Sequence, residues 1–291
     1  MKNKSISLIM ALLMIEVSVI IPTWNRKPRL RRALETVLAQ ESVAFELIVV
    51  DDGSTDGTET MIAAEFPSVT YVRQKNQGPA AARNTGIRQA SGAWIAFLDS
   101  DDEWMPRKLR TQLSFFEGRP DYRICQSEEI WIRNGRRVNP MDKHRKYGGQ
   151  IFERCLPLCI ISPSAVMMAR DLFDEVGLFD ETFPACEDYD LWLRIASRFP
   201  VGLIESPHVI RYGGHSDQQS QAYQAMDQFR IRALVNILNS NVLTPEQRRA
   251  AAETLEDKAA IYIRGATKRG KNDEAARVQA MLSRLETSLP A

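Results

Sequence analysis

The chain has 291 residues, of which 44% are hydrophobic and 26% charged, a balance typical of one large packed domain or of a domain with an appendage. Its 38 Lys and Arg residues are matched by 37 Asp and Glu residues, so the formal charge is +1 and no overall positive field exists to bind nucleic acid. The 4 cysteines have neither the density of a disulfide framework nor the spacing of zinc ligands, which predicts reduced thiols, with Cys155 and Cys159 one turn apart on a helix face.

The first residues resemble a short signal peptide, because two lysines precede an apolar run at residues 6–15. A small-residue cleavage site does not follow, Glu16 interrupts the run, and the run is too short to span a bilayer. We therefore expect residues 1–13 to be a loosely attached extension, or a misassigned start, before a compact unit that begins at Met14.

From residue 17 to residue 105 the chain alternates strand patterns with helix patterns. Runs of β-branched and apolar residues predict strands at residues 17–21, 45–50, 69–73 and 93–98, with helical patterns between them. This alternation predicts βαβ units and a parallel sheet, in which ligands bind outside the carboxyl ends of the strands. The polar residues expected along that edge are Thr23, Asp51, Asp52, Asp99 and Asp101.

The acidic stretch FLDSDDEW, residues 97–104, follows the fourth predicted strand. Asp99, Asp101 and Asp102 repel one another unless a positive charge lies between them, and carboxylate oxygens suit Mg²⁺ or Mn²⁺ bound together with substrate phosphates. The competing interpretation is a solvated turn whose aspartates cap a helix that begins near Pro106.

Four motifs in this order and spacing, VSVIIPTWNR, VVDDGSTDGT, NQGPAAARNTGI and FLDSDD, resemble the family 2 glycosyltransferases. The resemblance implies the GT-A fold, an α/β architecture with a Rossmann-like, mixed, mainly parallel sheet flanked by helices. It predicts a GT-A domain at residues 14–220, composed of a nucleotide-binding half, 14–105, and an acceptor half, 106–220. A C-terminal helical appendage, residues 221–291, follows.

The resemblance also implies which residues hold the nucleotide. They lie after the first two strands, at the start of the third helix and within it, and after the fourth strand. The competing interpretations are that Thr23 and Asn25 are only turn residues and that Arg83 is a salt-bridged helix residue. The full set is Pro22, Thr23, Asn25, Asp51, Asp52, Gly78, Arg83 and Asp99.

A divalent cation, Mn²⁺ or Mg²⁺, is the cofactor that the resemblance implies. Asp99 and Asp101 correspond to the DXD motif of the family, in which the first acid faces the ribose or the metal and the second binds the ion. His215 follows two glycines after predicted strands at residues 201–204 and 208–212, where several family members carry a metal-ligating or diphosphate-facing histidine. A surface histidine is the competing interpretation.

Beyond residue 121 the apolar pieces become shorter, at residues 124–125, 129–132 and 164–168, and a polar loop interrupts them. The basic cluster of that loop could meet an acidic or membrane-borne acceptor, and a solvated loop is the competing interpretation. Its members are Arg133, Arg136, Arg137, Lys143, His144, Arg145 and Lys146.

The stretch FPACEDYDLWLRI, residues 183–195, has helical spacing and begins with paired acids. Glu187 and Asp188 lie in the first turn, where the helix dipole favours negative charge, and this stabilisation alone could explain them. They also match the ED motif of the resembled family, in which the residue at Asp188 is the catalytic base, with Glu187 the next candidate. Asp190 and Arg194, four residues apart, can form a helix ion pair.

The rest of the chain is helical by pattern. Thr244 and Gln247 frame a capping box with Pro245 at the first helical position, and helices at residues 250–263 and 272–285 flank a break at Gly270. This region contains no apolar stretch long enough to cross a bilayer. We expect the helices to cover the catalytic domain or to form a homodimer, and peripheral membrane contact stays open.

The expected activity is inverting transfer of a sugar from a nucleotide-diphospho-sugar, foremost a UDP-sugar, to a hydroxyl of a saccharide or lipid-linked saccharide. The resemblance implies bacterial surface polysaccharide or lipopolysaccharide assembly at the cytoplasmic side of the membrane. One alternative is a sugar nucleotidyltransferase, whose glycine-rich, lysine-bearing signature is absent near the first strand. The other is a catalytically silent nucleotide-sugar-binding module, whose expected mark is a broken DXD or ED motif; both motifs are intact.

Overall fold

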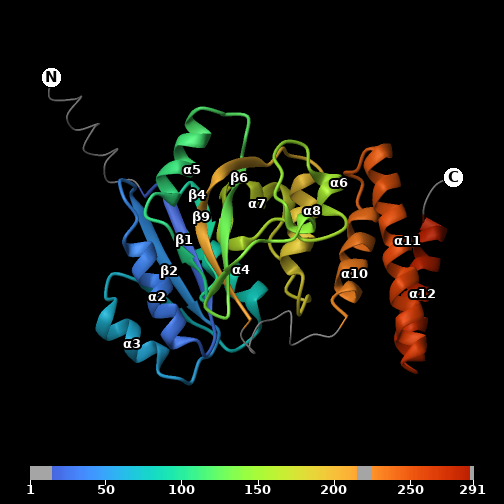
Figure 1. Cartoon of the computed structure of the whole chain (residues 1–291), viewed down its shortest axis with the longest axis horizontal. Helices are drawn as coiled ribbons and strands as arrows, with labels where there is room; N and C mark the ends of the chain where they lie inside the picture. Colours follow the sequence, from blue (N-terminus) through green and yellow to red (C-terminus); the bar gives the residue numbers. More distant parts are fainter. Residues whose placement is uncertain (1–14, 215–224, 289–291) are drawn as a thin grey trace.

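The computed structural model describes residues 15–214 and 225–288, and within them a mixed sheet lies between two sets of helices (Figure 1). Residues 1–13, predicted to be an extension, His215, and the predicted domain boundary at residue 220 lie outside the described residues. The strands are β1 (Val17–Thr23), β2 (Phe45–Asp51), β3 (Thr70–Arg73), β4 (Trp94–Phe97), β5 (Glu103–Trp104), β6 (Ile124–Arg133), β7 (Arg136–Val138), β8 (Val166–Ala169) and β9 (Gly202–Gly213).

The sheet has the order β3-β2-β1-β4-β8-β6-β9-β5, with β7 paired to β6. β1 pairs in parallel with β2 and β4, and β2 pairs in parallel with β3, as the βαβ pattern predicts. β8 then enters antiparallel to both β4 and β6, and β6 pairs in parallel with β9. The predicted α/β fold with a mixed sheet flanked by helices is confirmed.

Helices cover both faces of the sheet. Val17, Val19 and Ile21 of β1 pack on the face that carries α2, α3 and α5, whereas Ile20 packs on the opposite face with α4 and α8. The helices are α2 (Lys27–Leu38), α3 (Thr58–Glu65), α4 (Pro79–Gln89), α5 (Lys108–Glu117), α6 (Phe152–Cys155), α7 (Leu172–Val176), α8 (Glu187–Ala196), α10 (Asp227–Leu238), α11 (Pro245–Lys268) and α12 (Asn272–Ser288).

α4 lies unusually close to the sheet. A Cβ atom at Gly86 would stand 2.4 Å from Cγ2 of Ile20 in β1, which is closer than real Cβ atoms come to other atoms. Ala80 and Ala82 belong to the same core, so the small-residue face of α4 packs directly on the strands. This close approach places Arg83 of α4 beside Asp99, just after β4.

Two strands differ from their predicted form. The pieces predicted at residues 124–125 and 129–132 form one strand, β6, and those predicted at 201–204 and 208–212 form one strand, β9. The two strands pair along their length, with register irregularities between Ser127 and Glu129. Such bulges absorb extra residues without ending a strand, so the polar interruptions in the sequence did not mark strand ends.

The prediction for the two nearby cysteines was wrong. α6 ends at Cys155, so Cys159 lies beyond the helix and not one turn further along it. Helix periodicity cannot show this end, because a short helix in a packed loop is terminated by its tertiary surroundings.

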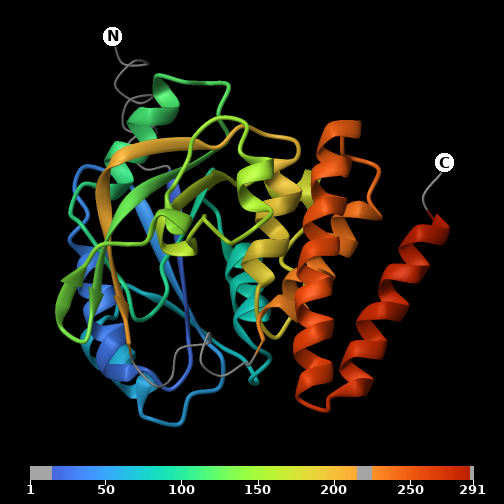
Figure 2. The same ribbon diagram turned by 45° about the vertical axis from the view of Figure 1, so that its right-hand side comes forward.

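The C-terminal helices stand side by side at one end of the molecule (Figures 1 and 2). Leu234 of α10 and Leu255 of α11 belong to the same hydrophobic core as Trp192 of α8. The predicted capping box is confirmed, because the Thr244 side chain accepts from Gln247 N and the Gln247 side chain accepts from Thr244 N. Across residues 15–214 and 225–288, no helix combines the length and the apolar character needed to cross a membrane.

Candidate active site

Two buried acids at the end of β2 shape the loops around them. The Asp51 carboxylate accepts hydrogen bonds from Ser54 N at 2.7 Å and from the Tyr71 hydroxyl at 2.6 Å. Asp52 accepts from the backbone N–H groups of Gln77, at 2.9 Å, and Gly78, at 2.8 Å. Both acids thus join the end of β2 to neighbouring segments, and Asp52 fixes the start of α4.

The residues after β1 form a second part of the same edge. Asn25, exposed and with a φ of 51°, accepts from Thr55 N at 2.8 Å, which ties the loop after β1 to the loop after β2. Thr23 Oγ1 is buried and has no hydrogen-bond partner among the described residues. An orphaned hydroxyl is uncommon in a folded protein, and a ligand at this strand end would satisfy it. Pro22 is buried within β1.

Gly78 begins α4 with a φ of 90°, a left-handed conformation that favours glycine. No other atom lies within 4 Å of the position that a Cβ would take. The backbone at the start of α4 therefore borders open space that a ligand could approach.

Three carboxylates gather in the loop after β4. Asp101 pairs with Arg26 at 3.0 Å, whereas Asp102 is buried and accepts from Ser164 Oγ, at 2.6 Å, and Tyr212 N, at 3.0 Å. Burial raises the pKa of Asp102 well above its ordinary value, and the nearby charges of Asp101 and Asp99 raise it further. Asp102 thus anchors the loop, whereas Asp99 and Asp101 are more exposed. The sequence alone did not distinguish Asp102 from the other two acids.

Arg83 connects this loop to the start of α8. Its guanidinium contacts Asp99 Oδ1 at 2.8 Å through Nη2 and Glu187 Oε1 at 2.6 Å through Nη1, and the Arg83 and Glu187 side chains are buried. Burial alone would lower the pKa of Arg83, but the charges of Asp99 and Glu187 raise it. The salt bridge of Arg83 is thus present and joins two motifs that are far apart in the sequence, and contact of Arg83 with a nucleotide stays a prediction.

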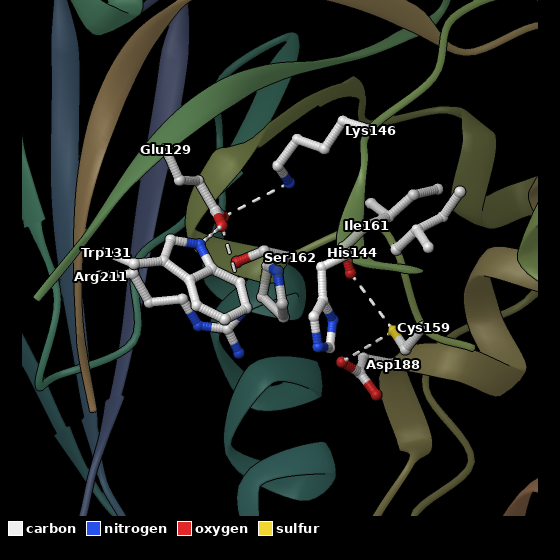
Figure 3. Close-up of a pocket in the computed structure, with 11 residues that line it drawn as sticks. Glu129, Trp131, His144, Lys146, Cys159, Ile161, Ser162, Asp188 and Arg211 are labelled. Atoms are coloured by element: carbon white, nitrogen blue, oxygen red, sulfur yellow. Dashed lines mark hydrogen bonds and ion pairs between the residues drawn. The ribbon is translucent and has the colours of Figure 1, made fainter. Parts of the chain in front are cut away.

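The paired acids at the start of α8 occupy different environments. Burial raises the pKa of Glu187, the Arg83 charge opposes this, and the charge of Asp188 adds to it. Asp188 is partly exposed and lines a pocket, where one oxygen accepts from the Cys159 thiol at 3.4 Å (Figure 3). Of the two predicted catalytic acids, Asp188 is the one that a substrate in this pocket would meet. The Asp190–Arg194 ion pair is present at 2.9 Å.

The pocket beside Asp188 is built largely from residues that sequence reasoning did not select. Glu129 and Trp131 come from β6 and Arg211 from β9, and Lys146 follows β7 (Figure 3). Glu129 accepts from Trp131 Nε1 at 2.9 Å and pairs with Lys146 at 3.4 Å. Burial raises the pKa of Glu129, but Lys146 and Arg211 outweigh burial and hold it below its ordinary value. Of these four residues, only Lys146 was selected from the sequence, as one member of the basic cluster.

That basic cluster divides in two in the folded chain. Lys146 is buried and His144 is half-buried, and both line the pocket. The solvated-loop interpretation therefore fails for these two. The other members are exposed, as both interpretations require, so their contact with an acceptor stays a prediction. The exposed members are Arg133, Arg136, Arg137, Lys143 and Arg145.

Two of the three residues expected to hold a metal ion, Asp99 and Asp101, lie within the described ranges. Over the described ranges, no group of three or more His, Cys, Asp or Glu side chains is arranged to bind a metal, and His215 lies outside those ranges. Asp99 and Asp101 nevertheless supply hard carboxylate oxygens, and their charges already disfavour a third charge on Asp102. This mutual repulsion fits a divalent cation bound near the pair.

Comparison with known families and proteins gives consistent matches. The family model described as glycosyl transferase family 2 matches residues 18–177. An uncharacterized glycosyltransferase of Rickettsia felis is 38% identical over 192 residues, and the match covers 65% of this chain and 32% of the relative. The chain thus spans about a third of the length of that relative.

Two relatives are covered over more of their length. The uncharacterized glycosyltransferase YwdF of Bacillus subtilis is 31% identical, with 70% of this chain and 77% of the relative covered. Escherichia coli WfaP, named UDP-Glc:alpha-D-GlcNAc-diphosphoundecaprenol beta-1,3-glucosyltransferase, is 33% identical, with 62% of this chain and 70% of the relative covered.

Solved structures share the fold. TarS 1–349 of S. aureus in complex with UDP-GlcNAc has a TM-score of 0.74 and 21% identity, covering 95% of this chain and 82% of TarS 1–349. Mannosyltransferase PcManGT from Pyrobaculum calidifontis, in complex with GDP-Man and Mn²⁺, has a TM-score of 0.59 and 18% identity, covering 94% of this chain and 87% of PcManGT. These likenesses confirm the predicted GT-A fold.

Proposed function

Since the chain belongs to glycosyl transferase family 2, we propose that it transfers a sugar from a nucleotide-diphospho-sugar to a hydroxyl group of an acceptor, with inversion at the anomeric carbon. The observation that carries this proposal is the buried Arg83 bridge between Asp99 and Glu187. This bridge connects the carboxyl-terminal edge of the parallel strands, where a nucleotide would bind, to the paired acids of α8 through a single side chain. A transferase needs this proximity, because donor and acceptor must meet at one reacting carbon.

Asp188 is the general base of the proposed reaction. It lines the pocket, whereas Glu187 is buried and paired with Arg83. The Asp188 carboxylate takes the proton of the acceptor hydroxyl as that oxygen attacks the anomeric carbon. The bond between this carbon and the diphosphate oxygen breaks, and its electron pair leaves with the nucleoside diphosphate. A single displacement inverts the configuration, so an α-linked donor gives a β-linked product.

Binding of the donor is assigned to the strand-end edge. Thr23 and Asn25 lie where the nucleotide would be held, and the open space at Gly78 lets a ligand approach the start of α4. Asp101 and Asp99 would hold the Mn²⁺ or Mg²⁺ ion, which when bound supplies positive charge against the diphosphate. In the structure Arg26 pairs with Asp101 and Arg83 pairs with Asp99.

A UDP-sugar is the leading donor in this proposal. The TarS structure holds UDP-GlcNAc and WfaP is named for UDP-Glc, whereas PcManGT holds GDP-Man, which keeps a GDP-sugar as the second choice. The acceptor is a saccharide or a lipid-linked saccharide, the latter being the class named for WfaP. We place the reaction at the cytoplasmic side of the membrane, in the assembly of a bacterial surface polysaccharide.

A panel of UDP- and GDP-sugars with Mn²⁺ or Mg²⁺ tests the proposal without knowledge of the acceptor. We expect one donor to raise the melting temperature, since a ligand that binds only the native state stabilises it, and the same donor to release its nucleoside diphosphate slowly into water. A chelator should abolish the metal-dependent part of both signals.

Each rival gives a different result, the first with the same panel and the second in a parallel assay with a nucleoside triphosphate and a sugar phosphate. A silent binding module shows the rise in melting temperature without release of the nucleoside diphosphate. A sugar nucleotidyltransferase instead releases pyrophosphate from a nucleoside triphosphate and a sugar phosphate. A chain that neither binds nor cleaves any member of the panel would contradict the proposed function.

A further inference from the structure

Cys159 lies in the pocket directly against the side chain of Asp188. Its sulfur is 3.4 Å from Asp188 Oδ2 and 3.3 Å from the carbonyl oxygen of Ile161, and Figure 3 shows both interactions. The other Asp188 oxygen accepts from the backbone N–H of Tyr189 at 2.7 Å. The thiol therefore contacts the carboxylate oxygen that is not bound to the backbone of α8.

The thiol is suited to donate in this place. Burial raises the pKa of the Cys159 thiol well above its ordinary value, and the charge of Asp188 adds to this effect, so the group stays protonated at neutral pH. A thiol has one proton, and two acceptors compete for it here. The position of that proton can therefore follow the charge of Asp188.

We propose that Cys159 is a positioning residue for Asp188: its thiol donates to Oδ2 of the carboxylate and orients the other lone pairs toward the acceptor hydroxyl. This inference rests on the proposed function, in which Asp188 is the general base. Cys159 does not touch the reacting atoms and takes no proton from the substrate.

The same contact can adapt when Asp188 becomes protonated. While Asp188 is a carboxylate, the thiol proton points to Oδ2. After Asp188 has taken the acceptor proton, the thiol turns its own proton to the Ile161 carbonyl, and the sulfur can accept weakly from the new O–H. No other proton moves, so the thiol favours the charged form of Asp188 without blocking its protonation.

Other charged and titratable groups near Asp188 set the background for a pH experiment. Arg83 reaches it from α4, Glu187 is its neighbour in α8, and Cys186 precedes that helix. Glu129, His144, Lys146 and Arg211 line the same pocket, and Tyr189 of α8 and Arg230 of α10 interact electrostatically with Cys159. Cys159 itself acts on Arg211, so the lost hydrogen bond is reported by a shift of the pH profile that Cys159→Ala shows and Cys159→Ser does not.

The test compares Cys159→Ala and Cys159→Ser with the parent protein. The readout is the pH dependence of nucleoside diphosphate release from the best nucleotide sugar of the panel, with Mn²⁺ and with water in place of the acceptor. For Cys159→Ala we expect the acid limb of kcat to move up by about 0.4 to 1 pH unit, the net value of a typical hydrogen bond, because a thiol is a weak donor. KM for the donor should not change, because the thiol does not contact the donor edge.

Cys159→Ser should restore the parent profile, since a hydroxyl also donates. Cys155→Ala is the matched control, because Cys155 is a buried thiol of the same region that makes no hydrogen bond to Asp188 within the described residues, and it should leave the profile unchanged. If Cys159→Ala fails to fold, Cys159→Val takes its place, because valine has a similar volume and no donor: an acid limb that moves up supports the proposal, and the parent profile overturns it.

Failure of this inference is distinct from failure of the proposed function. If Asp188→Asn no longer releases nucleoside diphosphate but Cys159→Ala has the pH profile of the parent, Asp188 is the base and Cys159 does not position it. If Cys159→Ala and Cys159→Ser shift the profile equally, packing and not hydrogen bonding is responsible, and the proposal is wrong. If Asp188→Asn releases nucleotide like the parent, the base assignment fails first.

Discussion

Glu187 and Asp188 are adjacent carboxylates whose side chains point in different directions, because successive residues of a helix are turned about 100° apart. Glu187 points into the protein and pairs with Arg83, whereas Asp188 points into the pocket. A buried, ion-paired acid holds two segments together, and a partly exposed acid can exchange a proton with a substrate. The helix dipole stabilises both and so does not distinguish these roles.

Asp188→Asn tests whether Asp188 is the general base. The amide is nearly isosteric, so donor binding should change little, but it cannot take a proton and turnover should fall by about 10² to 10⁴. Thermal unfolding and release of nucleoside diphosphate must be measured on the same sample. If Asp188 only stabilised the helix dipole, its loss would lower the free energy of unfolding by at most about 1 kcal/mol and would have no specific effect on sugar transfer. Near-normal release by the folded variant would remove Asp188 as the base and make Glu187 the next candidate.

A second prediction concerns Asp101→Ala. The variant loses a carboxylate proposed to hold the divalent cation, so the rise in melting temperature with nucleotide sugar and Mn²⁺ should disappear while the fold survives. Glu103→Ala, two residues away in the same acidic stretch, is the control and should keep the rise, because Glu103 pairs with Arg32 on α2. Equal responses to Mn²⁺ in the parent and in Asp101→Ala would show that the metal lies elsewhere.

At the scale of one element, α5 contains a fully buried lysine. Lys108 Nζ donates to Gln112 Oε1 at 2.7 Å and lies 4.0 Å from the centre of the Trp104 ring. Burial lowers the pKa of Lys108 to about 7. The helix thus buries an amine that is close to neutral at physiological pH, beside the strand that follows the acidic loop.

This burial makes stability depend on pH. Between about pH 7 and pH 10.5 the unfolded chain binds a proton at Lys108 that the native protein does not, so stability should rise with pH, at most by about 1.4 kcal/mol per pH unit. Lys108→Met should remove this slope. Denaturant unfolding at pH 7.5 and pH 9 measures the slope. The free energy of unfolding of Lys108→Met, taken relative to that of the parent, should fall as the pH rises.

Lys75→Met, at an exposed lysine, is the control and should follow the parent at both pH values. A constant difference between Lys108→Met and the parent would mean that Lys108 is charged in the native protein throughout this range. Lys108→Met also loses the hydrogen bonds to Gln112 and to Val166 O. This loss changes its free energy of unfolding equally at pH 7.5 and pH 9, so the dependence on pH is unaffected.

At the scale of the whole molecule, one hydrophobic core runs from the sheet into the C-terminal helices. Ile20 of β1, Trp192 of α8, Leu234 of α10 and Leu255 of α11 belong to the same buried cluster. Gln247 also donates to Ser197 O just after α8, at 3.1 Å. We therefore expect these helices to unfold together with the sheet.

Leu255→Ala tests this expectation. Leu255 is 2% exposed, so the truncation should lower the free energy of unfolding by about 2 to 4 kcal/mol and shift a single transition seen by both fluorescence and circular dichroism. Ile261→Ala, on the same helix at 58% exposure, should cost less than about 0.5 kcal/mol. Two transitions, of which only one responds to Leu255→Ala, would show that the helices fold separately.

The homodimer expected through the C-terminal helices stays a prediction. Light scattering of the parent protein over a range of concentrations measures it directly. A monomer at every concentration would leave covering of the catalytic domain as the role of these helices.

Local features of the sequence were sufficient for much of the fold. The alternation of strand and helix patterns up to Leu98, the acids at the strand ends, the capping box at Thr244 and the acids opening α8 all depend on neighbours a few residues apart. The strands β6 and β9 were predicted in pieces, because their continuity depends on pairing between segments distant in the chain and on a bulge that has no local signature.

The candidate site was decided by contacts between distant residues. The motifs pointed to Asp99 and Glu187 separately, but only the packing of α4 against the sheet places Arg83 between them. Likewise, nothing near Cys159 in the sequence shows that it meets Asp188, 29 residues away, or that β6 and β9 wall the same pocket. A local pattern determines which residues stand at a strand end or a helix start, whereas burial and ion pairing arise only when remote segments exclude water together.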